Sequence, residues 1–253
     1  EADVVLVAGF PFDFRMGYGQ KINRKATLIS VNLDAVALKK NRKPTIGVLA
    51  HPGRFLVQLA DKVTARGAWD SWFSTLRARE EARDAEIASK ATTAGPLVDP
   101  VHLFLRIEDK IADDSVLIVD GGDFVATGAY IVRPRAPLSW LDPGVFGTLG
   151  VGGGFAVGAA SVRPDAEIWL FYGDGSSAYS LAEFDSCVRH GFAPIAVIGN
   201  DGSWQQIARD QVGLLGTDLG TVLLRSAYHT VAEGYGAKGL LLTDPADIDR
   251  ILD

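Results

Sequence analysis

The sequence predicts an α/β protein built on doubly wound parallel sheets. Short β-branched runs end at Gly, Pro or Asn, as buried parallel strands do, and segments with helical apolar spacing lie between them. These units form two groups, before and after a charged stretch that has no Gly or Pro between Ala68 and Ala94. Alternating strands and helices are typical of parallel sheets with right-handed crossovers. We therefore expect two α/β layers joined by a helix.

The first layer, residues 1–66, carries three strand candidates and one helix. The strands are DVVLVAG (3–9), TLISVNL (27–33) and TIGVLA (45–50). A helix is expected over 53–66, where apolar residues recur at helical spacing: Phe55, Leu56, Leu59 and Val63. Residues 67–95 mix acids and bases, which predicts an exposed connecting helix.

The second layer, 96–253, begins with an amphipathic helix that has Pro100 in its first turn. The strand candidates that follow are SVLIVDGG (115–122), EIWLFY (167–172), PIAVIG (194–199) and LLLT (240–243). The helix candidates are the later, apolar part of the Gly/Ala-rich stretch 147–164, which stops before Pro164, the segment 177–189 and a segment that starts at Pro245. In the helix 177–189, an apolar face is predicted to lie on the sheet: Leu181, Phe184 and Val188.

Bulk composition limits the possible functions. The net charge of −6 argues against a nucleic-acid partner, because phosphate binding needs a basic surface. No apolar run approaches the roughly 20 residues that span a membrane. The single cysteine, Cys187, allows no internal disulfide, so we expect a cytoplasmic protein. The acidic opening EADVVLVAG lacks an initiator Met and a signal peptide, so we expect a piece of a longer protein.

Two buried strand candidates end in an oxygen-bearing residue beside a glycine turn. Asp174 follows EIWLFY within Gly-Asp-Gly, and Asn200 ends PIAVIG 26 positions later, which leaves room for one crossover helix. If the strands are neighbours, their carboxyl ends bring Asp174 and Asn200 together, at the edge where open α/β sheets bind ligands. A Gly-Asp-Gly alone is usually just a turn. The second strand end at this spacing favours a binding site.

Carboxylate and amide oxygens suit Mg²⁺ or Ca²⁺ and are poor ligands for zinc. The carbonyl of Gly202 could be a third ligand, and the amides of Gly175, Ser176 and Ser177 could face an anion at a helix N-terminus. The segment therefore predicts an anchor for Mg²⁺ and a diphosphate.

Gly173-Asp174-Gly175 followed by Asn200 resembles the cofactor motif of thiamine-diphosphate enzymes. That motif usually ends in Asn-Asn, and here the first of the pair is Gly199. Further segments extend the resemblance over essentially the whole chain: WLDPGVFGTLGVGGGFAVGAA, DGGDFVATG, GFPFDFRMGYG and VNLDAVALKKNRKP. The chain is most similar to the acetolactate synthase-like group, which includes 2-hydroxyacyl-CoA lyases. The resemblance implies the C-terminal half of a Rossmann-like central domain (1–66), a helical linker (67–95) and a diphosphate-binding domain (96–253).

The resemblance implies thiamine diphosphate and Mg²⁺ as cofactors and assigns residues to them. Asp174, Asn200 and the Gly202 carbonyl match the metal ligands. Leu149 matches the apolar wedge that holds the cofactor in a V shape, although a plain core leucine is the alternative. Gly147 matches the carbonyl that accepts from the pyrimidine amine. Residues matching the diphosphate contacts and their flanks are Gly122, Asp123, Phe124, Gly173, Gly175 and Ser176.

Other candidates have competing interpretations. Arg15, Asp34 and Asn41 match positions near the adenine nucleotide of FAD- or CoA/ADP-binding relatives, or belong to a solvated loop. Trp204, Gln205 and Gln206 line a substrate pocket or form a surface helix. GVGGGF fails as a dinucleotide motif, because Phe155 stands where the third glycine belongs. Cys187 lacks a basic partner and is predicted to be structural. No metal-site spacing joins the four histidines: His51, His102, His190 and His229.

The resemblance implies a C–C bond lyase or carboligase acting on 2-oxoacids or 2-hydroxyacyl-CoA. Alternatives are a 2-oxoacid or oxalyl-CoA decarboxylase, and a cofactor-binding module without catalysis. The family activates its cofactor with a glutamate from another domain, which we expect upstream of Glu1, and builds each site between two subunits. We therefore expect a small-molecule substrate, a homodimer or homotetramer of the longer protein, and an inactive isolated chain.

Overall fold

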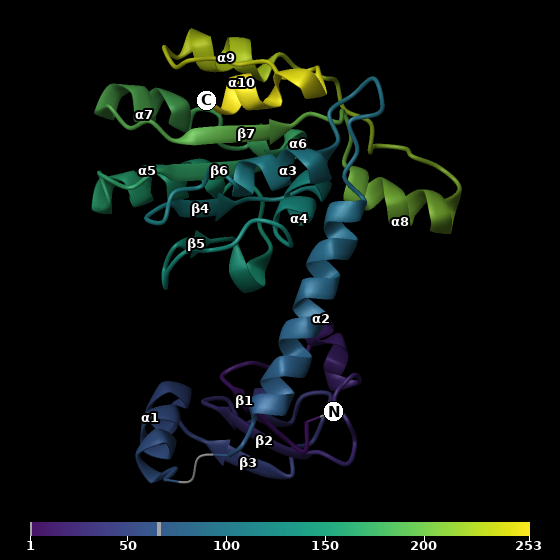
Figure 1. The fold of residues 1–253 in the computed structure, drawn as a ribbon, viewed down its shortest axis with the longest axis vertical. Coiled ribbons are helices and arrows are strands. Elements are labelled where there is room, and N and C mark those ends of the chain that lie inside the picture. The colour runs from purple at the N-terminus through teal and green to yellow at the C-terminus, as the bar shows by residue number, and fades with distance from the viewer. Residues whose placement is uncertain (1, 65–66) are drawn as a thin grey trace. The chain divides into compact units, whose positions relative to one another are not determined.

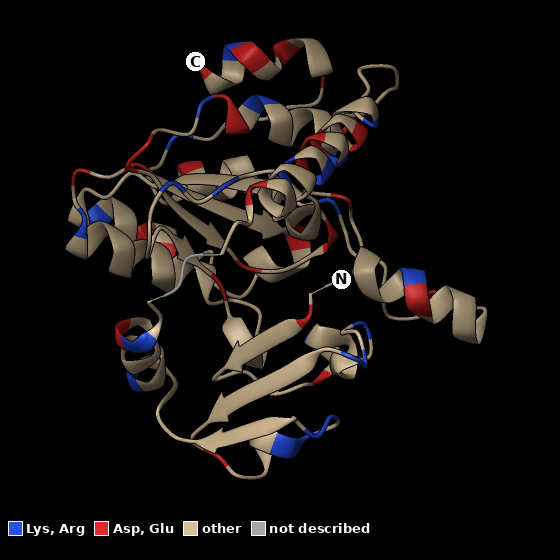
Figure 2. Ribbon diagram, turned by 60° about the horizontal axis from the view of Figure 1, so that its bottom comes forward, with Lys and Arg blue, Asp and Glu red and all other residues tan. Residues whose placement is uncertain are grey.

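A computed structural model describes residues 2–64 and 67–253, which form two compact units, Glu1–Thr75 and Leu76–Asp253 (Figure 1). Each unit has its own sheet, and every strand pair in both sheets is parallel. The predicted α/β fold with parallel sheets is therefore confirmed. The strands carry no charged residue, and the charges lie on helices and loops (Figure 2). The division between the units lies inside the predicted linker 67–95, whose own limits stay a prediction.

The first unit contains a three-stranded sheet in the order β1 (Val4–Ala8), β2 (Thr27–Asn32) and β3 (Ile46–Leu49). The central strand β2 is the buried one, whereas the edge strand β3 is largely exposed, which corrects the prediction of three buried strands. The short helices are η1 (Phe14–Gly19) and η2 (Ala37–Lys39).

Helix α1 (Pro52–Lys62) is capped by the His51 imidazole, which accepts a hydrogen bond from the Arg54 amide. It ends earlier than the predicted helix 53–66, so Val63 lies beyond it, and residues 65–66 are outside the described part of the chain. No residue of α1 is buried. Of its predicted apolar face, Phe55 is half-buried, whereas Leu56 and Leu59 are exposed.

Helix α2 (Asp70–Ser89) is the exposed helix predicted for the connecting stretch, and Ile87 is its one buried residue. The C-terminal part of α2 belongs to the second unit, where Arg133 donates to Asp84 in an ion pair at 2.6 Å. Ile87 joins the large apolar cluster of that unit.

The second unit has a four-stranded sheet in the order β5 (Trp140–Leu141), β4 (Val116–Val119), β6 (Ile168–Gly173) and β7 (Ile195–Gly199). Every residue of β4 and β6 is buried, because helices cover both faces (Figure 1). Its helices are α3 (Pro100–Glu108), α4 (Asp123–Gly128), α5 (Gly152–Val162), α6 (Asp174–Ser177), α7 (Glu183–His190), α8 (Gln205–Leu215), α9 (Tyr228–Gly234), α10 (Ile248–Leu252), η3 (Gly144–Phe146) and η4 (Pro245–Asp247).

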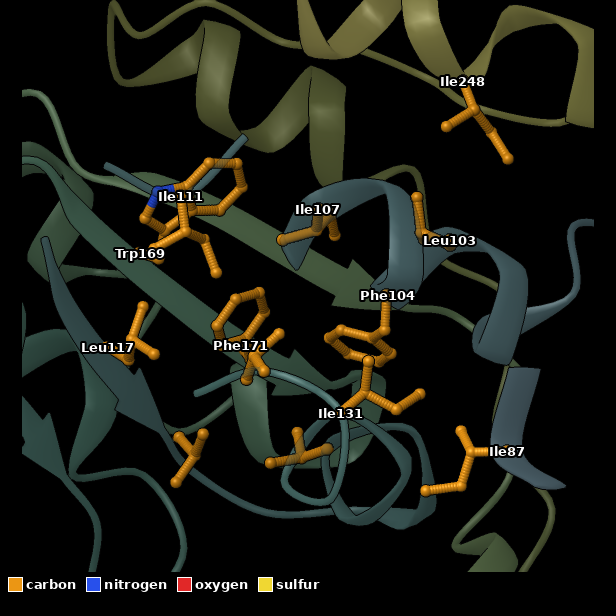
Figure 3. Close-up of a cluster of buried hydrophobic side chains, with 13 residues drawn as sticks. Ile87, Leu103, Phe104, Ile107, Ile111, Leu117, Ile131, Trp169, Phe171 and Ile248 are labelled. Carbon is orange, nitrogen blue, oxygen red and sulfur yellow. The ribbon is translucent and has the colours of Figure 1, made fainter. Parts of the chain in front are cut away.

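Successive side chains of β6 enter two different cores, as the two-residue period of a strand requires. Trp169 and Phe171 pack with Phe104 of α3 in the cluster shown in Figure 3, where the Phe104 and Phe171 rings meet edge to face at 5.4 Å. Leu170 and Tyr172 enter the cluster that faces α5. Each fully buried side chain of this size contributes about 1.5–3 kcal/mol of transfer free energy, so the two cores hold β6 firmly in the middle of the sheet.

Two predicted elements are wrong. The helix expected over 177–189 is interrupted, since a turn after α6 separates it from α7 and points Ser180 to the Tyr172 hydroxyl at 2.7 Å. The face of α7 is buried through Phe184 and Cys187, while Val188 is 39% exposed.

The second is the strand expected over 240–243, where the chain is irregular and β7 remains the sheet edge. Leu242 packs on the core without strand pairing, and Leu240 and Leu241 are exposed. None of the helices in the described part of the chain combines the length and apolar character needed to cross a bilayer.

Candidate cofactor site

The carboxyl ends of β6 and β7 bring Asp174 and Asn200 together. The two strands are paired in a register that sets Gly173 opposite Gly199, and each of these glycines directly precedes one of the two polar residues. The inference that the two strands are neighbours is therefore confirmed. Asp174 begins the one-turn helix α6, so its carboxylate lies at the sheet edge and not within the strand.

Asp174 is held rigidly by backbone amides. Its side chain is buried, with one carboxylate oxygen accepting from the Gly175 amide and the other from the Gly202 amide, both at 2.7 Å. The Tyr228 hydroxyl donates to its carbonyl at 3.1 Å. An ionised carboxylate has about four acceptor positions, so these bonds orient Asp174 and leave lone pairs for a cation.

Asn200 and Gly202 each keep an oxygen that could bind a metal. The Asn200 amide nitrogen donates to the Ser226 carbonyl at 2.8 Å, which identifies Oδ1 as the acceptor end of the side chain. The Gly202 carbonyl accepts from the Leu223 amide at 2.8 Å, and a carbonyl has a second lone pair. One carboxylate, one amide oxygen and one carbonyl form a hard donor set that suits Mg²⁺.

The electrostatics of this edge also favour a cation. Burial raises the pKa of Asp201, and the neighbouring Asp174 carboxylate raises it further. Two carboxylates that repel each other here would both be stabilised by a divalent ion. Across residues 2–64 and 67–253, no group of three His, Cys, Asp or Glu side chains forms a metal site, so the mixed donor set is the candidate.

The turns after β4 and β6 form a cradle of bare backbone. Gly122 has a φ of +120°, and a Cβ built on it would lie 3.0 Å from the Gly173 Cα. A Cβ on Gly173 would lie 2.8 Å from the Gly121 carbonyl oxygen. The Ser176 hydroxyl is used internally, donating to the carbonyls of Gly121 and Gly173 at 2.8 and 3.1 Å. What the cradle offers a ligand is therefore its main chain, as close binding of a diphosphate requires.

Leu149 lies directly on this cradle. A Cβ built on Gly121 would be only 2.1 Å from the Leu149 Cδ2, so the half-buried leucine rests where a side chain at 121 would be. Gly147, two residues earlier, is exposed and left-handed with φ of +57°. The structure thus places Leu149 beside the turns after β4 and β6.

The family model described as "Thiamine pyrophosphate enzyme, C-terminal TPP binding domain" matches residues 120–253, which contain the whole candidate site. The chain belongs to the thiamine pyrophosphate enzyme family. Among its relatives, 2-hydroxyacyl-CoA lyase 2 of Danio rerio is 44% identical over all of this chain and 42% of its own length. The Homo sapiens protein of that name is 42% identical over 96% of this chain and 39% of its own.

A second group of relatives is more distant. Acetolactate synthase large subunit IlvG of Mycobacterium tuberculosis is 32% identical over all of this chain and 46% of its own length. The solved Rhodococcus jostii RHA1 thiamine diphosphate-dependent 4-hydroxybenzoylformate decarboxylase superposes with a TM-score of 0.74 at 22% identity, covering 99% of this chain and 46% of that one. The chain therefore spans less than half the length of these relatives, and the predicted resemblance to the family is confirmed.

The departure of this chain from the family's Asn-Asn pair has a packing explanation. A Cβ on Gly199 would lie 2.1 Å from the Phe124 Cγ, so only glycine fits. Phe124 also packs on Phe104, with ring centroids 4.6 Å apart. Asp123, its neighbour, forms an ion pair with Arg209 at 2.6 Å. The side chains of Asp123 and Phe124 are thus engaged within the protein, and their contact with a cofactor stays a prediction.

Trp204 covers the other side of the cradle. A Cβ on Gly175 would lie 2.5 Å from its indole ring, and the Tyr179 ring is 6.5 Å away. Trp204 is therefore placed next to Asp174, whereas Gln205 and Gln206 are exposed at the start of α8. A role of these three residues in binding substrate stays a prediction.

The nucleotide candidates of the first unit have partners within the chain. Arg15 pairs with Asp13 at 2.5 Å, and Asn41 donates to the Phe12 carbonyl at 2.5 Å. Asp34 accepts from the Val36 amide at 2.7 Å. A hollow of about 410 Å³ is lined by Asn41 and does not include Arg15 or Asp34, so the three are not brought to one cavity there.

Cys187 and Asp120 are two further buried residues of the second unit. Cys187 is buried, and burial raises the pKa of its thiol, with Glu183 adding to the effect, as a structural cysteine requires. Asp120, which sequence reasoning missed, is 5% exposed at the end of β4. The signal was present, since Asp120 follows a buried strand as Asp174 does.

Proposed function

We propose that this chain is the diphosphate-binding part of a Mg²⁺-dependent thiamine-diphosphate C–C lyase or carboligase that acts on 2-hydroxyacyl-CoA or 2-oxoacids. The observation that carries the proposal is the pairing of Gly173 with Gly199, which sets Asp174 beside Asn200. The relatives named 2-hydroxyacyl-CoA lyase 2, at up to 44% identity, support the CoA-linked substrates over pyruvate.

The residues that would hold the cofactor follow from the geometry. Asp174, Asn200 and the Gly202 carbonyl would bind Mg²⁺, and the backbone around Gly122 and Gly175 would face the diphosphate. Bound thiamine diphosphate supplies an acidic thiazolium carbon that can add to a carbonyl carbon. Leu149 would wedge beneath the cofactor and keep its two rings in a V, and the Gly147 carbonyl would accept from the pyrimidine amine.

The rest of the site would come from outside this chain. The proposal places the activating glutamate in a preceding domain, and the complete site between two subunits of a cytoplasmic homodimer or homotetramer. Binding of FAD or CoA/ADP by the first unit is part of the same proposal. Without the glutamate, general acid–base assistance worth roughly 10² to 10⁴ in rate is lost, so the isolated chain should not turn over.

A substrate comparison on the full-length protein tests the proposal. With thiamine diphosphate and Mg²⁺, cleavage of a 2-hydroxyacyl-CoA to an aldehyde and formyl-CoA should exceed acetolactate formation from pyruvate. Faster turnover of pyruvate would assign the protein to the acetolactate synthase reaction. Oxalyl-CoA decarboxylation as the fastest reaction would contradict the proposal, and so would cofactor binding with no turnover of any of these.

A further inference from the structure

Helix α5 begins without a cap from its own N-terminal residues. Val151, at the N-cap position, makes no side-chain hydrogen bond, and glycines follow it. The first amides of a helix have no partner within the helix and need one elsewhere. Here the partner is Asp120 at the end of β4, whose carboxylate accepts from the Gly152 amide at 2.7 Å and from the Gly150 amide at 2.9 and 3.0 Å.

The space for this carboxylate is tightly defined. A Cβ on Gly152 would lie 3.0 Å from the Asp120 Oδ2 and 2.8 Å from the Leu170 Cδ1, so a side chain at 152 would displace it. Burial raises the pKa of Asp120, while the amides of Gly150 and Gly152 oppose that rise. Burial disfavours the charged form of this carboxylate, and the two amides stabilise that form by donating hydrogen bonds to it.

The two amides that Asp120 holds lie just after Leu149 in the chain. Gly150 directly follows Leu149 in the chain, and Gly121 directly follows Asp120. The Leu149 methyl rests on Gly121. The Asp120–Gly121 pair therefore fixes both the backbone after Leu149, through hydrogen bonds, and the side chain of Leu149, through contact.

We propose that Asp120 is a positioning residue, which sets Leu149 and the Gly147 carbonyl for cofactor activation by clamping the Gly150 and Gly152 amides. This inference rests on the proposed function. Asp120 acts through the loop and has no contact of its own with the cofactor. Removing the clamp should loosen Leu149 while leaving the Asp174 end of the site intact, since the Asp174 bonds to Gly175 and Gly202 do not involve Asp120.

The first test needs no cofactor. In the full-length protein, amide hydrogen exchange at Gly150 and Gly152 should quicken at least roughly 10-fold in Asp120→Asn. The substitution removes the negative charge and turns one of the two accepting oxygens into an NH2 donor, which would face the Gly150 amide. Ser180→Ala is the matched control. Its hydroxyl accepts from the adjacent Gly153 amide at 3.3 Å, and its loss should leave Gly150 and Gly152 protected.

The second test separates positioning from general damage. Asp120→Asn should slow hydrogen–deuterium exchange at the thiazolium carbon of bound thiamine diphosphate roughly 10- to 100-fold. The Kd for thiamine diphosphate with Mg²⁺ should change less than about 3-fold, because the hydrogen bonds that orient Asp174 do not involve Asp120. Asp120→Ser has a shorter, uncharged side chain and should have the same effects on both measurements. It replaces Asp120→Asn if that variant does not fold.

Three results would overturn the inference. Unchanged protection of the Gly150 and Gly152 amides in both variants would show that Asp120 does not hold them. An equal fold loss in cofactor affinity and in thiazolium exchange would make Asp120 a general structural residue. If the wild-type protein binds no thiamine diphosphate, the proposed function fails and this role fails with it, even when the amide data show the clamp.

Discussion

Replacing Gly121 by Ala should displace Leu149 while leaving the fold intact. The new Cβ would lie 2.1 Å from the Leu149 Cδ2, whereas ordinary contacts begin near 3.4 Å. The methyl must therefore move by at least about 1.3 Å. Because the clashing atom is the end of a half-buried, flexible side chain, the free energy of unfolding should fall by only about 1 kcal/mol or less.

The functional effect should be much larger than the effect on stability. A misplacement of about 1 Å in a positioned group can cost roughly 100-fold in rate. We expect Gly121→Ala to slow hydrogen–deuterium exchange at the thiazolium carbon about 10- to 100-fold in the full-length protein. Leu149→Ala should slow it by a similar factor, with diphosphate affinity nearly retained.

The assay is exchange into the thiazolium carbon followed by proton NMR after acid quench, with thermal unfolding measured in parallel. Gly154→Ala is the matched control, because a Cβ there meets nothing within 4 Å on the exposed face of α5. It should leave exchange unchanged and stabilise the helix by about 0.5–1 kcal/mol.

The double variant Gly121→Ala/Leu149→Ala tests whether Gly121→Ala acts by moving Leu149. If Gly121→Ala acts by moving Leu149, the double variant should be no slower than Leu149→Ala alone. Effects that multiply, or an unaltered exchange rate in Gly121→Ala, would refute the idea that contact with Gly121 positions Leu149.

Three further predictions concern stability and reactivity. Gly199→Ala should lower the free energy of unfolding by about 1–3 kcal/mol in urea titrations, because its Cβ would meet Phe124 close to the main chain. The control is Gly158→Ala, whose Cβ meets nothing within 4 Å, and an equal or smaller loss of stability in Gly199→Ala would contradict the packing explanation. Arg135→Met should cost about 1–3 kcal/mol by the same assay, since its guanidinium pairs with Glu108 at 2.6 Å and also bonds the carbonyls of Glu108 and Ile111; a neutral result would mean that solvent replaces these bonds. Cys187 should alkylate at pH 8 at least about 10-fold more slowly in the native protein than in urea, because burial raises the pKa of its thiol, and equal rates by peptide mass spectrometry would contradict its burial.

The ends of the strands could be predicted from the sequence because they depend only on neighbouring residues in the chain. A buried parallel strand is a short apolar run, and the residue after it lies at the carboxyl edge wherever the strand sits in the sheet. Asp174 and Asn200 could therefore be placed together before the structure, and the register of β6 and β7 then fixed them as neighbours.

Contacts between distant residues could not be predicted in this way. The cap of α5 comes from Asp120, 32 positions before Gly152, and no pattern within α5 indicates it. The need for glycine at 199 depends on Phe124, which belongs to another helix.

The errors have related causes. The segment 240–243 has strand-like composition but finds no strand to pair with beyond β7. The interruption before α7 depends on a bond between Ser180 and Tyr172, which tertiary packing supplies.

In the proposed function, Asp174 and Asn200 anchor Mg²⁺ and the diphosphate of thiamine diphosphate. Calorimetric titration of the full-length protein with thiamine diphosphate, with and without Mg²⁺, measures this role. We predict Mg²⁺-dependent binding by the wild-type protein and at least a roughly 100-fold loss in Asp174→Ala, with wild-type affinity in the control Asp185→Ala, whose carboxylate pairs with Arg189 on the exposed side of α7. Mg²⁺-dependent affinity that is unchanged in Asp174→Ala would show that Asp174 does not bind the metal.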